Sequence, residues 1–389
     1  MTPRERVQTA LYHQEPDRIP IDLGGSVVTS IGLEAYASLR QRLGLPRREI
    51  RTMETVQQIA FVDEDAMDAL GADIVPVFAN PPSGGAPIFT DDGNGGDSFV
   101  DDFGATLARP RDCGYYDWRT FPLSEPSIDA MHRMPWPNPA DPALYRGLRE
   151  RVKALRGSTD RALFGMAPGG HDLFNQLFRV RGMEEGMVDL VANLEFAEAF
   201  FDRLTATIIT AQELFLAEVG DLIDVHFAAD DLAGQSGPLV SPATWRKLIK
   251  PRQARIMAAI KARTRAPVFY HSCGAIREFL PDLVEIGVDI VNPVQVAAAG
   301  MDTRELKRLF GNRLSFWGGG VDTQKVLPYG TMAEVRAEVE RRVADLAPGG
   351  GFVFNPVHNI QPGVPAENIA EAYAVARCMG TYPLGGGRG

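Results

Sequence analysis

Residues 266–295 read APVFYHSCGAIREFLPDLVEIGVDIVNPVQ, and this stretch contains a complete strand–helix–strand unit. An apolar run at its start ends in polar residues, and a second apolar run begins at residue 288. The segment between them, 274–287, carries apolar residues at helical spacing. A strand, a helix and another strand in alternation are typical of a parallel β-sheet. We therefore predict two neighbouring parallel strands joined by a helix.

The same unit repeats along the chain. Short apolar runs recur with helical stretches between them, and their near-continuous apolar character predicts strands that are buried on both faces. Eight such units favour an α/β fold closed into a (β/α)8 TIM barrel over an open sheet. The predicted strands span residues 18–25, 72–78, 162–170, 222–230, 266–274, 288–295, 313–322 and 350–359.

Two helices have clear start signals. The segment TPRERVQTALYHQ begins with Thr2 as a cap and Pro3 at the first helical position. The segment 241–263, SPATWRKLIKPRQARIMAAIKAR, has Ser241 as a cap and apolar residues at helical spacing. Both segments therefore predict helices.

Residues 79–160 interrupt the strand–helix alternation. Turn residues and polar–apolar alternation in this region predict a β-hairpin insertion after the second strand, followed by a Pro-rich connection. A connection of this length is expected to cover part of the barrel mouth. We predict a single barrel domain over residues 1–380 and a flexible tail over residues 381–389.

Composition narrows the functional class. A formal net charge of -10 gives no attraction to phosphate backbones, so nucleic-acid binding is not expected. No stretch approaches the roughly 20 apolar residues of a membrane helix, and the charged N-terminus lacks the apolar region of a signal peptide. Three cysteines at positions 113, 273 and 378 do not suggest a disulfide framework, so we expect a cytoplasmic protein.

Polar residues gather at the carboxyl ends of the predicted strands. In a (β/α)8 barrel these ends converge on one face, where active sites are built. We therefore expect Asp230, Asp231 and His226, from the fourth strand, to take part in catalysis. The residues expected to contact substrate are Gln235, Asn292, Gln295, Asp322 and Asn355.

His271 and Cys273 predict a metal site. Two positions apart on a strand, they share a face and can reach one ion. A thiolate with imidazole suits zinc, and a catalytic zinc keeps three protein ligands and one open position. The preferred third ligand is His358, with Asp230 or Asp231 as the alternative. The competing interpretation makes Cys273 a small buried apolar residue and His271 a hydrogen-bonded core residue.

Other features are less specific. Asp230 and Asp231 also suit a loop that caps the next helix. The glycine-rich turns at 317–324 and 348–354 lack the spacing of nucleotide-binding loops, so close backbone approach is the preferred explanation. Trp118 in the insertion either lines a pocket or packs the insertion against the barrel.

Five segments together resemble the uroporphyrinogen decarboxylase superfamily, whose fold is the TIM barrel. They are residues 2–22, 230–251, 269–295, 300–331 and 349–374. The decarboxylases of this superfamily carry an Arg-rich stretch at the first strand, which pairs with the acidic side chains of the porphyrinogen. Here the corresponding stretch, IDLGGSVVTSIGLEAY, has no Arg, so decarboxylation is the lesser alternative.

The second branch of the superfamily is similar to cobalamin-linked methyltransferases, which hold zinc through H-x-C and a Cys near the last strand. His271 and Cys273 match the first two ligands, and His358 stands where the third ligand, a Cys, would be. A His in that place leaves the site less negative, so activation of a thiol is less expected.

The resemblance implies a zinc-dependent methyltransferase that moves a methyl group between a small substrate or acceptor and a corrinoid (cobalamin) carried by a partner protein. The alternatives are a uroporphyrinogen decarboxylase-like lyase, or a metal-dependent lyase or hydrolase that works without corrinoid. The expected partners are the corrinoid protein and the small-molecule substrate. A homodimer is a further option, and neither nucleic acid nor a membrane is expected.

Overall fold

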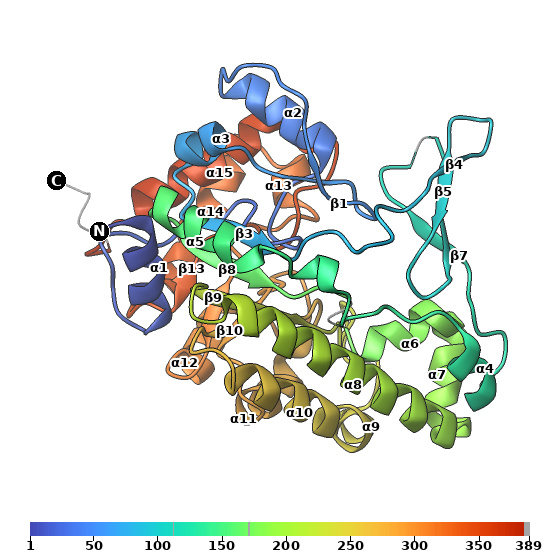
Figure 1. Cartoon of the computed structure of the whole chain (residues 1–389). Coiled ribbons are helices and arrows are strands. Elements are labelled where there is room, and N and C mark those ends of the chain that lie inside the picture. Colours follow the sequence, from blue (N-terminus) through green and yellow to red (C-terminus); the bar gives the residue numbers. More distant parts are fainter. Residues whose placement is uncertain (112, 170–171, 385–389) are drawn as a thin grey trace.

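The computed structural model describes residues 1–111, 113–169 and 172–384. Its centre is one curved sheet of seven parallel strands in the order β13-β12-β11-β10-β9-β8-β3, surrounded by helices (Figure 1). Each strand falls within a predicted strand: β3 (Ile74–Phe78), β8 (Ala162–Met166), β9 (Val225–Ala229), β10 (Val268–His271), β11 (Ile290–Asn292), β12 (Ser315–Trp317) and β13 (Phe352–Val353). The α/β barrel class is confirmed, although Gly170, within the third predicted strand, lies outside the described residues.

The first predicted strand, residues 18–25, joins the two edges of this sheet. The backbone N–H of Asp22 donates to the carbonyl of Phe354, just after β13, at 2.8 Å. On the other side, the N–H of Asp73, just before β3, donates to the carbonyl of Ile21 at 2.8 Å. Segment 18–25 therefore takes the place of the eighth strand, although it forms a bridge and not a regular strand.

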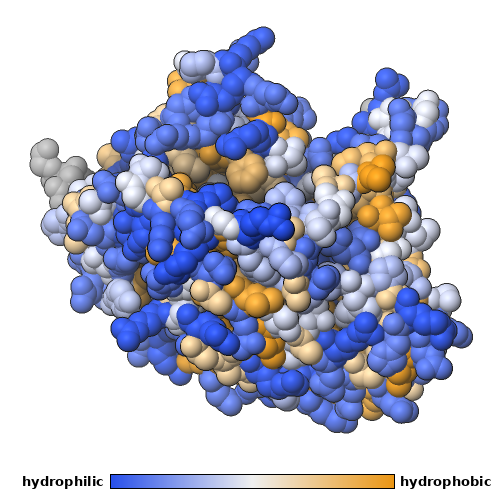
Figure 2. All heavy atoms as spheres, viewed as in Figure 1, coloured by the Kyte–Doolittle hydropathy of each residue, from blue (hydrophilic) through white to orange (hydrophobic). Residues whose placement is uncertain are grey.

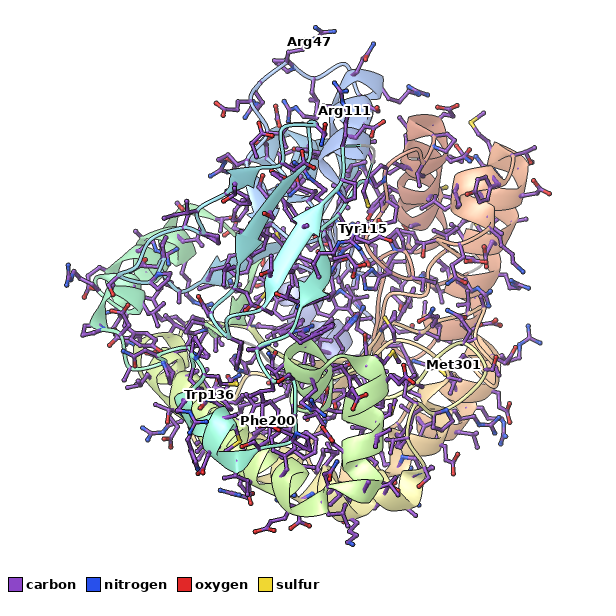
Figure 3. All side chains as sticks on the ribbon, turned by 90° about the vertical axis from the view of Figure 1, so that its right-hand side faces the viewer. Arg47, Arg111, Tyr115, Trp136, Phe200 and Met301 are labelled. Carbon is purple, nitrogen blue, oxygen red and sulfur yellow. The ribbon has the colours of Figure 1, made fainter. Side chains whose placement is uncertain are left out.

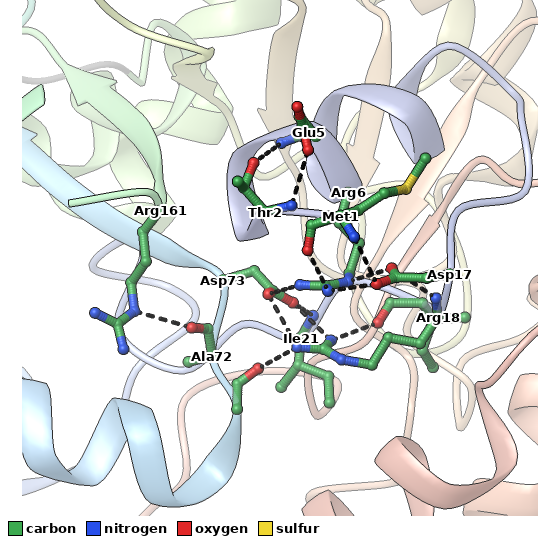
Figure 4. Close-up of polar contacts among 12 residues, drawn as sticks. Met1, Thr2, Glu5, Arg6, Asp17, Arg18, Ile21, Ala72, Asp73 and Arg161 are labelled. Carbon is green, nitrogen blue, oxygen red and sulfur yellow. Dashed lines mark hydrogen bonds and ion pairs between the residues drawn. The ribbon is translucent and has the colours of Figure 1, made fainter.

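A buried carboxylate holds this segment in place. Asp73 is 0% exposed, and it accepts hydrogen bonds from Arg6 at 2.6 Å, Arg18 at 2.7 Å and the backbone N–H of Ile21 at 2.8 Å (Figure 4). Because Arg6 lies on α1 (Pro3–Leu11), the same carboxylate also fixes the N-terminal helix against the barrel. The short irregular strand is thus stabilised by side chains where a longer backbone ladder is missing.

The predicted helix starts are found. Thr2 and Glu5 form a capping box at the start of α1, with Pro3 in the first turn. Ser241 caps α9 (Pro242–Leu248), but the predicted helix 241–263 is divided into α9 and α10 (Lys250–Lys261). Pro251 explains the break because it has no N–H to donate within a continuous helix.

The outer layer contains the remaining helices. Their bounds are α2 (Leu33–Arg42), α3 (Glu64–Leu70), α4 (Ile128–Arg133), α5 (Leu148–Ser158), α6 (Phe174–Arg181), α7 (Met183–Ala192), α8 (Leu194–Val219), α11 (Leu280–Glu285), α12 (Thr303–Phe310), α13 (Val326–Tyr329), α14 (Met332–Leu346) and α15 (Ala366–Met379). Among the described residues, no helix is both long and apolar enough to span a bilayer.

The insertion is larger than a hairpin. It forms a four-stranded antiparallel sheet of β4 (Thr90–Asp91), β5 (Asp97–Val100), β6 (Thr106–Arg109) and β7 (Asp117–Thr120). Figure 1 places this sheet on the side of the barrel opposite the two chain ends. A further antiparallel pair, β1 (Thr52–Glu54) and β2 (Ile59–Ala60), was not predicted because its strands are too short to show alternation.

Aromatic rings fill the barrel interior. Phe164 and Phe269 meet edge-on with ring centroids 4.9 Å apart, and Trp317 lies 5.4 Å from both. The face seen in Figure 2 is mostly hydrophilic, with hydrophobic side chains at the insertion and in smaller patches over the helices below it. Ile88 and Val100 of the insertion are 88% and 59% exposed, and exposed apolar side chains also occur on the outer helices, such as Val191 at 78% and Tyr329 at 85%.

The extreme C-terminus is partly packed. Thr381 bridges to Arg18, and the Tyr382 hydroxyl donates to the carbonyl of Ala347 at 2.7 Å. The predicted tail therefore holds contacts over residues 381–384, and residues 385–389 lie outside the described residues.

Candidate active site

Strand alternation decides which side chains reach the barrel mouth. Phe227 on β9 and Phe269 on β10 are paired in register and both belong to the interior cluster. Two residues further along, Ala229 pairs with His271. Since alternate residues of a strand share a face, His271 and then Asp231 point into the mouth.

The three predicted metal ligands come together at this mouth. Ligand atoms of His271, Cys273 and His358 all lie within 4.8 Å of one another. Sγ of Cys273 is 3.4 Å from Nε2 of His271, and the two imidazole rings have centroids 5.2 Å apart. β10 and the residues after it bring the first two side chains, and the segment after β13 brings the third.

His271 is oriented by a neighbouring strand. Its Nδ1 lies 2.6 Å from Oδ1 of Asn292, at the end of β11. The amide of Asn292 donates through Nδ2 to the carbonyl of Trp317 at 2.9 Å, which leaves Oδ1 as the acceptor. Nδ1 of His271 is therefore the donor to Asn292, and Nε2 faces Cys273. Such a hydrogen bond on the far nitrogen is the usual support of a metal-bound histidine.

Burial sets the protonation of the other two ligands. Burial, with His271 beside it, lowers the pKa of His358 to about 3, so this imidazole is neutral. Burial, together with the neighbouring Asp231, raises the pKa of the Cys273 thiol well above its usual range. A bound cation would reverse the second effect because coordination favours the thiolate.

Asp231 is the carboxylate closest to the three ligands. Its Oδ1 accepts the backbone N–H of Cys273 at 2.7 Å and lies 3.8 Å from Nε2 of His271. The side chain is 42% exposed, so a substrate can reach it. Asp231 can hold a proton or a substrate donor next to the three ligands.

The donor set fits zinc. One thiol and two imidazoles are ordinary zinc ligands, and a tetrahedral zinc holds a sulfur and a nitrogen about 3.6 Å apart. Cys273 and His271, at 3.4 Å, already have this spacing. A ligand atom of His358 lies within 4.8 Å of both, so the three residues together could hold one ion.

Asp230 and His226 lie on the other side of the sheet. Asp230 is 0% exposed and accepts the backbone N–H groups of Phe174 and Asn175, so it caps the start of α6. Nε2 of His226 is 2.5 Å from Oε1 of Gln212 on α8. Alternation along β9 explains both placements. His226 and Asp230 are at even positions, so their side chains point to the face opposite to that of Ala229.

Asp230 also has unusual acidity. Its burial, with Asp172 nearby, raises the pKa of the carboxyl to about 7. The carboxyl also accepts from Nε2 of Gln253 at 2.8 Å. These contacts join the strand end to α6 and α10.

Five residues were expected to bind substrate: Gln235, Asn292, Gln295, Asp322 and Asn355. None of these described residues lines the cavity that lies at the barrel mouth. Asn292 supports His271, and Oε1 of Gln295 accepts the N–H of Gly274 at 2.7 Å, which holds the loop after Cys273. Gln235 is exposed in a turn, Asp322 accepts the N–H of Gln324, and Asn355 donates to the carbonyls of Asp22 and Thr29.

A cavity of about 530 Å³ opens beside this site, and two of the three ligand candidates, His271 and His358, line it. From the barrel it is lined by Phe227, Ala229, Asp231, His271 and His358. The insertion was expected to cover part of the mouth and Trp118 was a candidate for lining a pocket, but the other residues of the opposite walls were not predicted. These walls come from the segment around β1, from α6 and from the insertion, and include Glu54, Val56, Phe99, Phe103, Leu107, Trp118, Asp172, Gln176 and Arg179.

One signal in the sequence could have found part of this wall. Asp172, Gln176 and Arg179 follow β8 and are four and three positions apart. This is the spacing of one helix face, here at the barrel mouth.

The two tryptophans of the insertion region differ in role. Trp118 lines the cavity, whereas Trp136 packs against Phe200 with centroids 5.6 Å apart (Figure 3).

Fold and site together define the class of protein: an enzyme built on a (β/α)8 barrel with polar side chains converging at the carboxyl ends of the strands. The sequence profile of the uroporphyrinogen decarboxylase (URO-D) family matches residues 121–378. The chain therefore belongs to this family.

Known relatives agree with this assignment. The chain is 25% identical over 348 residues to uroporphyrinogen decarboxylase of Thermus thermophilus, covering 86% of this chain and 87% of the relative. It is 28% identical over 253 residues to uroporphyrinogen decarboxylase of an Anaeromyxobacter species, covering 62% and 65%. A methyltransferase from Methanosarcina mazei shares the fold, with a TM-score of 0.62, 17% identity, and coverage of 97% and 98%.

Proposed function

We propose that this protein is a zinc-dependent methyltransferase that exchanges a methyl group between a small substrate and a corrinoid carried by a partner protein. The observation that carries the proposal is the convergence of His271, Cys273 and His358 beside a cavity that His271 and His358 line. Three ligands of this chemistry with an open side are typical of a catalytic zinc.

The chain's own residues prepare this chemistry. Asn292 keeps Nε2 of His271 free to bind, and burial keeps His358 neutral and so able to bind. When bound, zinc supplies a Lewis acid for an oxygen, nitrogen or sulfur atom of the substrate. Asp231, exposed to the cavity beside Cys273, accepts or returns the proton of that atom.

Decarboxylation of a porphyrinogen is the second candidate, since the curated relatives at 25–28% identity carry that name. The charge of the cavity speaks against it. The walls contain the carboxylates of Glu54, Asp101, Asp102, Asp172 and Asp231. Among the described wall residues, Arg179 is the only arginine, and it is paired with Asp172 at 2.7 Å. A substrate rich in carboxylates would be repelled here.

Metal analysis tests the site. We expect purified wild-type protein to carry about one zinc ion per chain and Cys273→Ala to lose it. Cys378→Ala is the matched control because Cys378 is exposed on α15. Zinc at 1,000 times its Kd should also stabilise the wild type by about 4 kcal/mol, and Cys273→Ala should lack this gain. Wild-type protein without metal affinity would contradict the proposal.

Activity tests the reaction. Reduced free cobalamin, offered with methoxylated aromatics, methylamines or methyltetrahydrofolate, should become methylated in the presence of the wild type and not of Cys273→Ala. Release of carbon dioxide from uroporphyrinogen would favour the decarboxylase instead. Turnover of any of these substrates without cobalamin would favour a metal-dependent lyase or hydrolase.

A further inference from the structure

Two buried N–H donors, on residues that line the cavity, have no acceptor among the described residues. They are Nε1 of Trp118, on β7, and Nε2 of Gln176, on α6. Gln176 is 2% exposed, and both residues line the cavity that His271 and His358 also line. Buried polar groups in folded proteins are almost always paired, so an unpaired donor in a cavity calls for an explanation. A bound ligand with an acceptor atom provides one.

Arg179 holds both donors in position. Its Nη1 contacts Oε1 of Gln176 at 3.5 Å, which distinguishes the acceptor end of that amide from the free N–H end. The guanidinium also lies over the ring of Trp118, 5.4 Å from the centroid. Arg179 itself is fixed by its ion pair with Asp172 at 2.7 Å. The two donors therefore belong to a preformed arrangement that spans α6 and the insertion.

The remaining walls define the rest of the ligand. Arg179 is neutralised by Asp172, and the other wall carboxylates disfavour an anion. A quaternary ammonium has no acceptor atom, so it would leave both N–H donors unpaired. The apolar walls suit a flat hydrophobic body, and they are formed by Val27, Val56, Phe99, Phe103, Leu107 and Phe227.

We propose that this cavity binds an uncharged, flat, apolar molecule through an oxygen acceptor, a carbonyl or hydroxyl, that receives hydrogen bonds from Trp118 and Gln176. The insertion and α6 thereby select the substrate, while the barrel supplies the reacting site. The inference deepens the proposed function and rests on it for the chemistry, although its donors are separate from the metal ligands.

Calorimetric binding of matched probes to the full chain tests this selection. 4-Methoxyacetophenone carries a carbonyl acceptor, and 1-ethyl-4-methoxybenzene has nearly the same shape without it. We expect the ketone to bind more tightly, and Gln176→Leu and Trp118→Phe each to weaken it about tenfold, as expected for one hydrogen bond. Both variants should weaken the binding of the ethyl compound less than that of the ketone, so that the preference for the ketone is lost.

Gln41→Leu and Trp136→Phe are the matched controls. Gln41 is exposed on α2, and Nε1 of Trp136 is already satisfied by the carbonyl of Met131 at 2.9 Å. Neither residue lines the cavity, so both variants should bind the two probes like the wild type.

Two further probes test whether the cavity prefers an uncharged ligand over an anion or a cation. Tighter binding of 4-methoxybenzoate or of phenyltrimethylammonium than of the ketone would overturn the inference. So would equal binding of the ketone and the ethyl compound, or binding of none of the four probes. Each titration is run with zinc-loaded and chelator-treated protein. A ketone preference in protein that neither binds zinc nor transfers methyl groups would support the inference while the proposed function fails.

Discussion

Oδ1 of Asn292 lies 2.6 Å from Nδ1 of His271, and the two residues pair in register across β10 and β11. The same amide donates to the carbonyl of Trp317 on β12. Three neighbouring strands therefore set the direction of one imidazole. The metal-ligand candidates are oriented by the sheet before any ion binds.

Asn292→Ala should lower zinc affinity by about 10- to 100-fold, the usual effect of removing the hydrogen-bond partner of a ligating histidine. Without Asn292, the ring of His271 can rotate and either nitrogen can carry the proton. Competition with a chromophoric chelator measures the affinity directly.

Asn368→Ala controls for the loss of a buried amide. Nδ2 of Asn368 donates to the carbonyls of Leu327 and Gly330, away from the cavity. We expect this variant to lose stability and to keep its zinc affinity. Equal losses of affinity in the two variants would show that Asn292 acts only through stability.

Gly274→Ala should disturb the loop that carries Cys273. Gly274 has φ +88°, and an added Cβ would lie 2.3 Å from the carbonyl oxygen of Ala233. The backbone must therefore shift. The cost of this shift adds to the roughly 1–2 kcal/mol that alanine loses by adopting the left-handed conformation. We expect both a lower free energy of unfolding and a lower zinc affinity.

Gly287→Ala separates these effects. Gly287 has φ +101°, but its added Cβ would approach nothing closer than 3.7 Å, at Lys261. Urea unfolding should show a loss in both variants, whereas chelator competition should show weaker zinc binding only for Gly274→Ala. Unchanged zinc affinity in Gly274→Ala would contradict the role given to this loop.

Asp73→Ala should destabilise the barrel by about 3–5 kcal/mol because it leaves the guanidinium groups of Arg6 and Arg18 without their buried partner. Urea unfolding measures the change. Asp221→Ala is the control, since Asp221 pairs with Arg149 at the surface and is 62% exposed. Its loss should stay below about 1 kcal/mol. Similar losses in both variants would refute the closing role of Asp73.

Asp22 should make stability fall as pH rises towards neutrality. Burial raises the pKa of this carboxyl to about 7, although Trp317 donates to it at 2.9 Å. Between about pH 4 and pH 7 the folded state therefore holds a proton that the unfolded state has lost. From this one group the free energy of unfolding falls with rising pH, by up to about 1.4 kcal/mol per pH unit.

Asp22→Asn removes this group's contribution to the pH dependence of the free energy of unfolding. The test compares the slopes of the profiles, so it does not depend on how stable the variant is. We expect urea unfolding at pH 5, 6 and 7 to give a flatter profile for Asp22→Asn than for the wild type. Asp302→Asn, at the exposed cap of α12, should keep the wild-type profile. Parallel profiles for Asp22→Asn and the wild type would rule out a shifted Asp22.

The sequence predicted the strands better than the side chains that face the site. Buried strands such as 268–271 are visible as apolar runs because both faces of a barrel strand are covered. Adjacent carboxylates at 230 and 231 looked equivalent, yet one caps α6 and the other faces the cavity. Alternation along the strand would have distinguished the two carboxylates. Residue 231 has the same parity as 227 and 229, which face the interior, whereas residue 230 has the opposite parity.

The insertion shows a different limit. Its turns and alternation indicated β-structure, but the number of strands and their pairing depend on contacts between residues distant in sequence. The same holds for the cavity wall, where Trp118 from the insertion meets Arg179 from α6. Local sequence patterns carry no information about such long-range contacts.

By itself, the sequence determined the strand–helix repeat, the start of the first helix and the H-x-C pair at the end of one strand, because periodicity, capping and spacing are local properties. Only the tertiary structure decided that His358 reaches that pair, that Asp230 turns away, and that the insertion closes a cavity over them. Those outcomes depend on how the sheet curls and which edges meet, and no single segment encodes that curvature.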